Sequence, residues 1–245
     1  MADPLRFTSL DHISLTATNQ QRALDFYSRL FGANLRKESD SERYYVRLGS
    51  SYMAVAQAAP GRRGGYIDHY CAGCEGVWLK PIEERLKEIG VMYTIPPPFG
   101  IFFTDPDGIR TQLWTGDSWL DVARTAPVFE RPVSEAPLFE AVRIANLDIG
   151  LPDVAKATPY YERLFGASLE GTGQQGVFQI GKSTLTLRKA AADPGIESVA
   201  IQVREIRSGD SAKLRALGAT PDSAEAGKRI NFRDPEGVRI SLIAM

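Results

Sequence analysis

The sequence predicts an α+β fold made of two tandem domains, because two segments recur along the chain in the same order. Phe26–Leu35 (FYSRLFGANL) matches Tyr160–Leu169 (YYERLFGASL) at seven of ten positions. Further on, DPDGIR from Asp105 matches DPEGVR from Asp234. Similar segments that recur in the same order along a chain are typical of a duplicated domain. We therefore assign residues 6–116 to a first copy, 117–137 to a proline-containing linker and 138–245 to a second copy.

Each copy divides again into two shorter units. In the first copy, Asp-His pairs that begin strands stand 57 residues apart, at His12 and His69, and the glycines that end the following helices stand 58 apart, at Gly32 and Gly90. A unit begins with an alternating strand, in which Ile13 lies opposite its neighbour His12. The helix that follows has apolar residues at helical spacing and a glycine stop. Short strands come next, so the unit reads strand, helix and three strands.

Three short strands and a turn complete the first copy's units. Tyr44–Leu48 and Tyr52–Gln57 are predicted strands of the first unit, and Ile109–Trp114 is the last strand of the second. Asp105-Pro-Asp-Gly is a turn, because proline presets the backbone angle and glycine accepts the left-handed one. We assign no metal to this turn or to its counterpart at Asp234, because turn chemistry explains both.

Composition and charge exclude several classes of protein. The chain has 43% hydrophobic and 24% charged residues, a net charge of −1 and a pI near 6.2. These values fit a globular protein and disfavour nucleic acid and membrane surfaces as partners. It contains two cysteines, too few for a disulfide framework, and neither a secretory signal nor a long apolar stretch. We expect a cytoplasmic protein that is a monomer or a homodimer and binds a small molecule.

The strand-opening Asp-His pairs, the helix ending FYxxLFG and the DPDGxRxxLW strand together resemble the vicinal oxygen chelate superfamily. That superfamily includes glyoxalases, fosfomycin and bleomycin resistance proteins, extradiol dioxygenases and epimerases. The resemblance covers nearly the whole chain outside the linker and the termini. It implies that two βαβββ units form a cupped mixed sheet in each domain.

The resemblance also implies a metal site in the first copy. The family's ligand positions fall on His12, His69 and Gln112, and the implied cofactor is a divalent metal ion, Fe(II) first, with Mn, Zn or Ni as alternatives. Two imidazoles and an oxygen donor are a reasonable divalent set. The family usually has Glu where Gln112 stands, and a neutral amide supplies no charge. Metal identity and occupancy are therefore open, as is the alternative that both histidines are buried, hydrogen-bonded remnants of an ancestral site.

The second copy lacks comparable ligands. Asn146, Ser198 and Ser241 occupy the positions of His12, His69 and Gln112, and none is a strong ligand for a transition metal. We interpret the second domain as structural, as a partner that closes over the first, or as a binder of an organic group. Some family members use a fourth ligand, and alignment of Gly49 with Gly108 puts Met53 at that position.

Three protein ligands leave positions open for substrate and for dioxygen or water, which favours a dioxygenase-type enzyme that binds a small oxygenated, or aromatic, substrate. The sequence does not identify a catalytic acid or base: both histidines are assigned as ligands, and Phe102 stands where ring-cleaving relatives have Tyr. Ser14, Cys71 and Tyr66 are candidates for a proton role. The predicted substrate-binding residues are Ser14, Cys71, Phe102, Arg110 and Trp114.

Two other functions stay open. A metal-free protein of the bleomycin-resistance type would sequester an aromatic or antibiotic ligand, and the neutral Gln112 favours that alternative. A glyoxalase-like lyase is the other.

Overall fold

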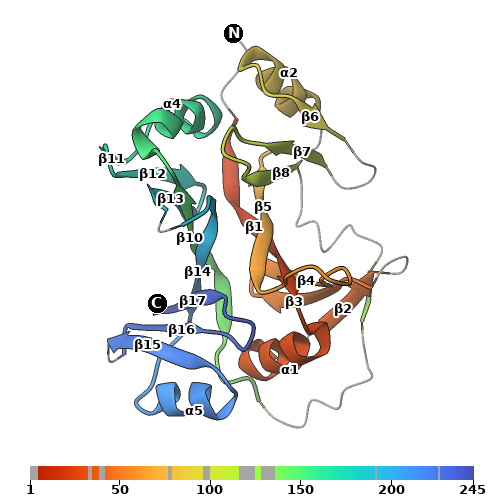
Figure 1. Ribbon diagram of the computed structural model, residues 1–245, viewed down its shortest axis with the longest axis vertical. Coiled ribbons are helices and arrows are strands. Elements are labelled where there is room, and N and C mark those ends of the chain that lie inside the picture. Colours follow the sequence, from red (N-terminus) through yellow and green to blue (C-terminus); the bar gives the residue numbers. More distant parts are fainter. Residues whose placement is uncertain are drawn as a thin grey trace. The chain divides into compact units, whose positions relative to one another are not determined.

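A computed structural model describes residues 5–32, 35–38, 42–76, 79–95, 100–115, 125–127, 136–190, 192–225 and 227–245. Within this part of the chain a strand, a helix and three strands follow one another four times (Figure 1). The predicted α+β fold of repeated βαβββ modules is therefore confirmed. No helix in the described part of the chain is long and apolar enough to cross a membrane.

The first copy supplies the first two modules. The first module consists of β1 (Phe7–Ala17), α1 (Gln20–Phe31), β2 (Leu35–Glu38), β3 (Tyr44–Leu48) and β4 (Ser51–Gln57). The second consists of β5 (Tyr66–Cys74), α2 (Lys80–Glu88), β6 (Tyr93–Thr94), β7 (Ile101–Thr104) and β8 (Arg110–Thr115). The predicted strand boundaries agree with these to within a residue.

The second copy supplies the other two modules. The third module consists of β10 (Ala141–Leu151), α4 (Val154–Phe165), β11 (Glu170–Thr172), β12 (Gln175–Ile180) and β13 (Ser183–Lys189). The fourth consists of β14 (Gly195–Val203), α5 (Asp210–Ala216), β15 (Thr220–Glu225), β16 (Arg229–Arg233) and β17 (Arg239–Ala244). One short strand, β9 (Thr125–Pro127), comes from the predicted linker and pairs with β2. The rest of that linker up to residue 135 lies outside the described residues.

All four modules share one pairing scheme. The first strand of each module runs parallel to its last strand, and hairpins join the later strands in antiparallel fashion. The four matched pairs at the start of these ladders are His12–Tyr52, His69–Arg110, Asn146–Thr184 and Ser198–Arg239. The sheet is therefore mixed, and the equivalent positions of the modules are fixed by register.

The helices of the two matched segments begin and end alike. Asn19 caps α1 by accepting a hydrogen bond from the backbone N–H of Arg22, and Asp153 caps α4 through the N–H of Lys156. Both helices stop where a glycine takes a positive φ, 98° at Gly32. Buried apolar side chains on α1 lie against β3 and β4, and each contributes about 2 kcal/mol by leaving water.

The chain folds into two compact units, and each takes modules from both copies. Unit 1 comprises Met1–Asp11, His69–Val122 and Ala145–Glu197, and unit 2 comprises His12–Asp68, Ala123–Ile144 and Ser198–Met245. Unit 1 thus holds most of the second and third modules, whereas unit 2 holds most of the first and fourth. The borders fall inside the opening strand of every module. The domain boundaries drawn from the sequence alone stay a prediction.

Inside each unit, a hairpin turn of one copy contacts the first strand of the other copy. In unit 2 the backbone N–H of Ser50 donates to the carbonyl of Val142 at 2.9 Å, and a side chain at Gly49 would collide with that carbonyl. In unit 1 the N–H of Lys182 donates to the carbonyl of Thr8 at 3.1 Å. Both contacts join a hairpin of one copy to the first strand of the other copy.

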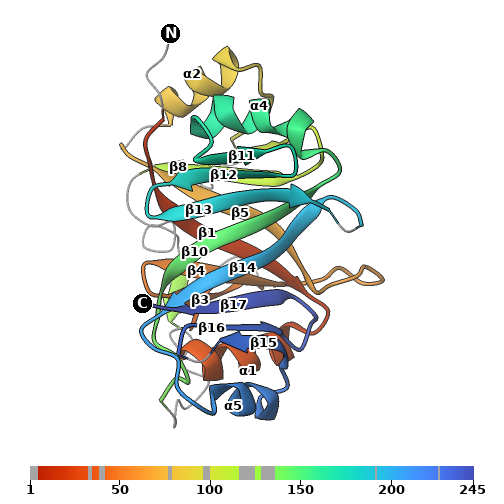
Figure 2. The same ribbon diagram turned by 90° about the vertical axis from the view of Figure 1, so that its left-hand side faces the viewer.

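Helices also meet across the copies inside a unit. In both views α2 and α4 of unit 1 lie side by side (Figures 1 and 2). Arg85 of α2 donates a hydrogen bond of 2.9 Å to the backbone carbonyl of Arg163 in α4. In unit 2, the ring of Phe26 in α1 lies 6.2 Å from that of Phe232 in β16. Each compact unit therefore needs residues from both halves of the sequence.

Candidate metal centre

His12 lies in the middle of β1 and is almost completely buried, with 3% of its surface exposed. Its ring stacks on that of Tyr52, the residue paired with it on β4, with the ring centroids 4.5 Å apart and an interplanar angle of 20°. A stacked aromatic neighbour limits rotation of the imidazole. The fold therefore holds one predicted ligand in a fixed, water-poor position.

Unit 1 gathers the other predicted ligands on one face of β5 and β8. His69 pairs with Arg110, and Cys71 pairs with Gln112. Because side chains two residues apart on a strand share a face, and paired residues on neighbouring strands do too, all four side chains project to the same side. The exposed fractions of His69 and Gln112 are 5% and 2%. The structure thus brings these two predicted ligands onto one buried surface.

Phe102 lies at the edge of this buried surface, and we call that edge, together with Arg110 and Trp114, the rim. It pairs with Gln112 on β8, and its ring meets that of His69 edge to face at 5.3 Å. The guanidinium carbon of Arg110 lies 4.8 Å from the centroid of the same ring, within the range of a cation–π contact. Trp114 is half-buried on the same face, two residues beyond Gln112.

A pocket of about 390 Å³ opens beside this rim. Its walls come from β6, β7, β8 and the residue before β6, and they are mainly aromatic or apolar. The lining residues are Met92, Tyr93, Thr94, Phe102, Phe103, Thr104 and Arg110. Arg110 is the one charged side chain among them, so the pocket presents a cation at the end of an apolar wall.

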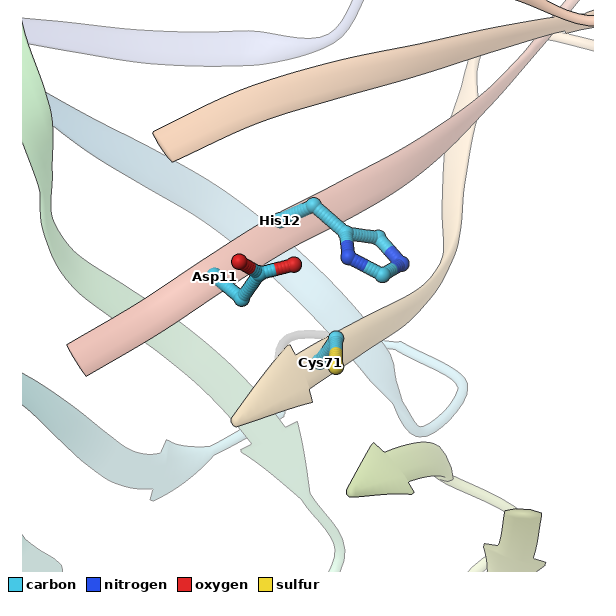
Figure 3. A group of neighbouring side chains, drawn as sticks. All are labelled: Asp11, His12 and Cys71. Atoms are coloured by element: carbon cyan, nitrogen blue, oxygen red, sulfur yellow. The ribbon is translucent and has the colours of Figure 1, made fainter. Parts of the chain in front are cut away.

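A group of three potential metal ligands lies on β1 and β5 (Figure 3). One ligand atom each from Asp11, His12 and Cys71 lies within 4.8 Å of the others, and all three residues are buried. Imidazole nitrogen, thiol sulfur and carboxylate oxygen are all donors to divalent transition metals. The donor chemistry around His12 therefore suits a divalent ion.

The two cysteines have different surroundings although both are buried and free. Burial raises the pKa of the Cys71 thiol well above its usual range, and the neighbouring Asp11 and Cys74 raise that pKa further. Burial alone raises the pKa of Cys74 to about 12. Cys74 stands three residues after Cys71 on β5, so its side chain points to the opposite face.

The register places one residue named from the sequence differently. Met53 pairs with Ile13, so it lies on the other face of the strands from His12. Its assignment to the fourth ligand position was wrong, because aligning the glycines of two unlike turns shifted the strand by one residue. Ala54, paired with Ser14, is the true equivalent of Gln112. Ser14 itself is buried on the same face of β1 as His12.

The sequence and the fold both resemble those of known proteins. A family model described as the Glyoxalase/Bleomycin resistance protein/Dioxygenase superfamily matches residues 9–78. Glutathione transferase FosA from Serratia marcescens is 26% identical over 131 residues, which cover 51% of this chain and 90% of that protein.

Solved dioxygenase structures share the fold over the whole chain. Homoprotocatechuate 2,3-dioxygenase from Brevibacterium fuscum superposes with a TM-score of 0.74 at 15% identity, covering 100% of this chain and 82% of the other. A xylose isomerase-like TIM barrel/4-hydroxyphenylpyruvate dioxygenase fusion protein gives a TM-score of 0.72 at 12% identity over 99% of this chain, which spans 50% of the fusion protein. These matches agree with the family resemblance seen in the sequence. At these identities the structural likeness establishes the fold.

In the third module, Asn146 stands at the position of His12, and hydrogen bonds to other polar side chains engage it. The amide oxygen of Asn146 accepts hydrogen bonds from Thr184 at 2.8 Å and Thr186 at 3.0 Å, and its amide nitrogen donates to Asp148 at 3.1 Å. Arg188 in turn forms an ion pair with Asp148. These hydrogen bonds explain the presence of Asn146 at this position in structural terms.

The fourth module gives the same result at the position of Gln112. Ser241 donates a hydrogen bond of 2.6 Å to the amide oxygen of Asn231, whose amide nitrogen donates to Ser223 at 2.8 Å. These bonds are made by short neutral side chains that bind transition metals weakly. The second copy therefore preserves the scaffold, with polar contacts where the first copy has the predicted metal ligands.

The turn aspartates have a further role that was not predicted from the sequence. One carboxylate oxygen of Asp105 accepts hydrogen bonds from the N–H groups of Asp107 and Ile109, as expected for this turn. The other accepts a hydrogen bond of 2.7 Å from the phenol of Tyr161, in the other copy. The signal was present in the repeat itself, because the matched segments contain both the tyrosine and the aspartate.

Proposed function

We propose that the chain is a metal-dependent enzyme of the dioxygenase type, which acts on a small oxygenated substrate bound at a divalent ion held by His12, His69 and Gln112. The observation that carries the proposal is the difference between the copies. Buried imidazoles begin both modules of the first copy, whereas Asn146 stands in the second copy at the position of His12 and is fully engaged in other hydrogen bonds. A scaffold role alone gives no reason for that difference.

A bound divalent ion would supply Lewis-acid polarisation of the substrate's oxygen atoms. Fe(II) is the first candidate, and Mn, Zn and Ni are the alternatives. The chain's own residues would orient the two imidazole rings and shield them from water. Tyr52 holds the ring of His12 by stacking, and Phe102 holds that of His69 from its edge. Burial of both imidazoles excludes water and strengthens every electrostatic contact around them.

The rim residues select the substrate. Phe102 offers an aromatic surface, and Arg110 lies over that surface with its charge toward the pocket of about 390 Å³. A planar substrate with an oxygenated end would direct that end to His69 and Gln112 and its remaining part to this pocket. An aromatic substrate with an acidic substituent fits these walls best, because Arg110 favours an anion.

Metal content tests the proposal directly. The wild-type chain, His12→Ala and His69→Ala are purified identically and their bound metal is quantified, with Ser198→Ala as the matched control in the second copy. We expect close to one equivalent in the wild type and the control, and loss in both histidine variants. Equal metal content in all four proteins would contradict the proposal. Oxygen uptake with catechols, before and after addition of a chelator, then tests the dioxygenase activity.

The alternative function is a metal-free binder of an aromatic ligand. The neutral Gln112 favours it, as does Phe102 at a place where ring-cleaving relatives have a hydroxyl. Tight binding of an aromatic compound that a chelator does not change would support this alternative. Chelator-sensitive turnover would exclude it.

A further inference from the structure

We propose that the fourth module carries an anion site of its own, in which Arg233 and Arg239 bind the phosphate group of a small phosphate monoester. Both arginines belong to unit 2, and the site needs no metal ion. The inference therefore goes beyond the proposed function and does not depend on it. It gives the second copy a binding role of its own.

Strand pairing places the two arginines opposite each other. Arg233 on β16 pairs with Arg239 on β17, and two residues along the same strands Asn231 pairs with Ser241. Phe232, which lies between Arg233 and Asn231, is 1% exposed, so its face of the sheet packs into the core. The buried face fixes the register, and the four polar side chains therefore share the other face.

Two like charges in this arrangement need a counterion. The Cβ atoms of directly opposed residues in an antiparallel pair lie about 5 Å apart, and like charges there destabilise the sheet. Within the described part of the chain neither arginine forms an ion pair with an acidic side chain. Asp234, which follows Arg233, accepts a hydrogen bond from Tyr27. Glu236 accepts one from the backbone N–H of Thr18. A bound dianion would balance both arginines at once.

Neutral groups in the adjacent row add further donors. Ser241 donates a hydrogen bond of 2.6 Å to the amide oxygen of Asn231, whose amide nitrogen donates to Ser223 at 2.8 Å. Because Ser223 accepts in this chain of bonds, its own hydroxyl proton is left to donate to a ligand. The guanidinium of Arg233 donates to the carbonyl of Gly237 at 3.3 Å, which holds it beside the turn that leads into β17. The donors are thus positioned before a ligand binds, which lowers the entropic cost of binding.

The charge and shape of this set of donors fit a phosphate monoester. Such a group carries a charge of about −1.5 to −2 at pH 7 and has three strong acceptor oxygens. Guanidinium groups match phosphate oxygens in a planar, bidentate manner. A benzoate carries one negative charge and would leave one of the two arginines unbalanced, so we expect it to bind here weakly.

The equivalent positions of the second module differ in the sense that the proposal requires. There the guanidinium of Arg110 lies over the ring of Phe102. In the fourth module Asn231 stands in place of that ring, and Arg233 stands in place of Thr104. Loss of the ring and gain of a second guanidinium change a surface for an aromatic group into a surface for an oxyanion.

Titration with glycerol 3-phosphate tests the inference, with the affinity measured by calorimetry at about 0.15 M salt. The full chain is compared as wild type, Arg233→Gln, Arg239→Gln and Arg229→Gln. Arg229 is the matched control, because it lies on the same face of β16 and pairs with Glu225, about 13 Å along the strand from Arg233. Its substitution changes the net charge of the chain by the same amount.

We expect Arg233→Gln and Arg239→Gln each to weaken binding by about 10-fold or more, because charge-assisted hydrogen bonds are lost. Arg229→Gln should change the affinity by less than about twofold, since its distance from the site exceeds the Debye length of about 8 Å at this salt concentration. Arg239 is exposed, so Arg239→Gln provides the test even if substitution of the half-buried Arg233 disturbs the fold.

A wild-type chain that does not bind glycerol 3-phosphate at millimolar concentration would overturn the inference. An equal loss in all three variants would overturn it too, because that result would show a general effect of net charge. Succinate is titrated in the same way, and tighter binding of succinate would overturn the assignment to phosphate. None of these outcomes bears on metal binding in the first copy.

Discussion

The phenol of Tyr27 donates a hydrogen bond of 2.6 Å to the carboxylate of Asp234, which lies 207 residues further along the chain. Tyr161 donates in the same way to Asp105, at 2.7 Å. The helix of each copy thus binds the DPxG turn of the other copy, once in each compact unit. All four side chains are buried. These paired contacts connect the two halves of the sequence.

Removing one phenol should destabilise the fold measurably. In Tyr27→Phe the buried carboxylate of Asp234 loses a hydrogen-bond donor, and we expect the free energy of unfolding to fall by about 2 kcal/mol, the usual size of a hydrogen bond to a charged group. Tyr161→Phe should act alike through Asp105. Tyr66→Phe is the control, since Tyr66 is 45% exposed. Urea denaturation measures all three, and an unchanged midpoint in both buried variants would refute a stabilising role.

The same tyrosines should make stability fall at alkaline pH. Burial and the neighbouring aspartate raise the pKa of Tyr27 well above its usual value, and Tyr161 behaves similarly. Above the ordinary tyrosine pKa of about 10, the unfolded chain loses the proton while the folded chain keeps it. Stability then decreases as pH rises, by up to about 1.4 kcal/mol per pH unit for each such group.

Comparison with a phenylalanine variant isolates this effect. Between pH 10 and 11 the unfolding free energy of the wild type should fall more steeply than that of Tyr27→Phe. Below pH 9 the difference between the two proteins should be constant. Parallel curves across the alkaline range would show that the pKa of Tyr27 is not raised.

Restoring a carboxylate at position 112 should strengthen metal binding. In Gln112→Glu a negative charge replaces a neutral amide beside the ion, and a charge pair in a partly buried site gains several kcal/mol before desolvation is subtracted. We expect affinity for Zn(II) or Fe(II) to rise by at least about tenfold. Ser241→Glu is the matched change in the second copy, and there we expect no gain. Calorimetric titration of both variants measures the effect, and equal gains would argue against a site in the first copy.

The guanidinium of Arg110 should select anionic ligands. We expect Arg110→Gln to weaken binding of 3,4-dihydroxybenzoate by about 10-fold or more, because a charge-assisted hydrogen bond is lost, and to change binding of uncharged catechol little. Arg239→Gln alters the equivalent residue of the fourth module and serves as the control. Equilibrium binding of the two ligands to each protein is measured by the change in protein fluorescence. An equal loss for both ligands would assign Arg110 a packing role.

The chain's local patterns were sufficient to predict much of the fold. Helix α1 ends at Gly32 as its pattern indicates, because a positive φ is a local requirement that glycine meets at little cost. The turn at Asp105 follows from proline and glycine in the same way. Such features depend on neighbours in sequence, so one sequence is enough to find them.

Strand register was harder to predict. Met53 was assigned one residue away from the correct position, and a shift of one residue moves a side chain to the opposite face of a sheet. Pairing between β1 and β4 depends on how the two strands pack and not on either strand alone. The same limit applied to Cys71, whose neighbours Gln112 and Asp11 come from other strands.

The sequence by itself determined that a βαβββ module is used four times and that histidines begin two of them, because repetition and residue identity are properties of the chain. Only the tertiary structure decided which modules pack together. Tyr27 and Asp234 meet because a buried phenol and a buried carboxylate satisfy each other once strands from both copies form one core. That partnership is a property of packing, and no local pattern in either segment contains it.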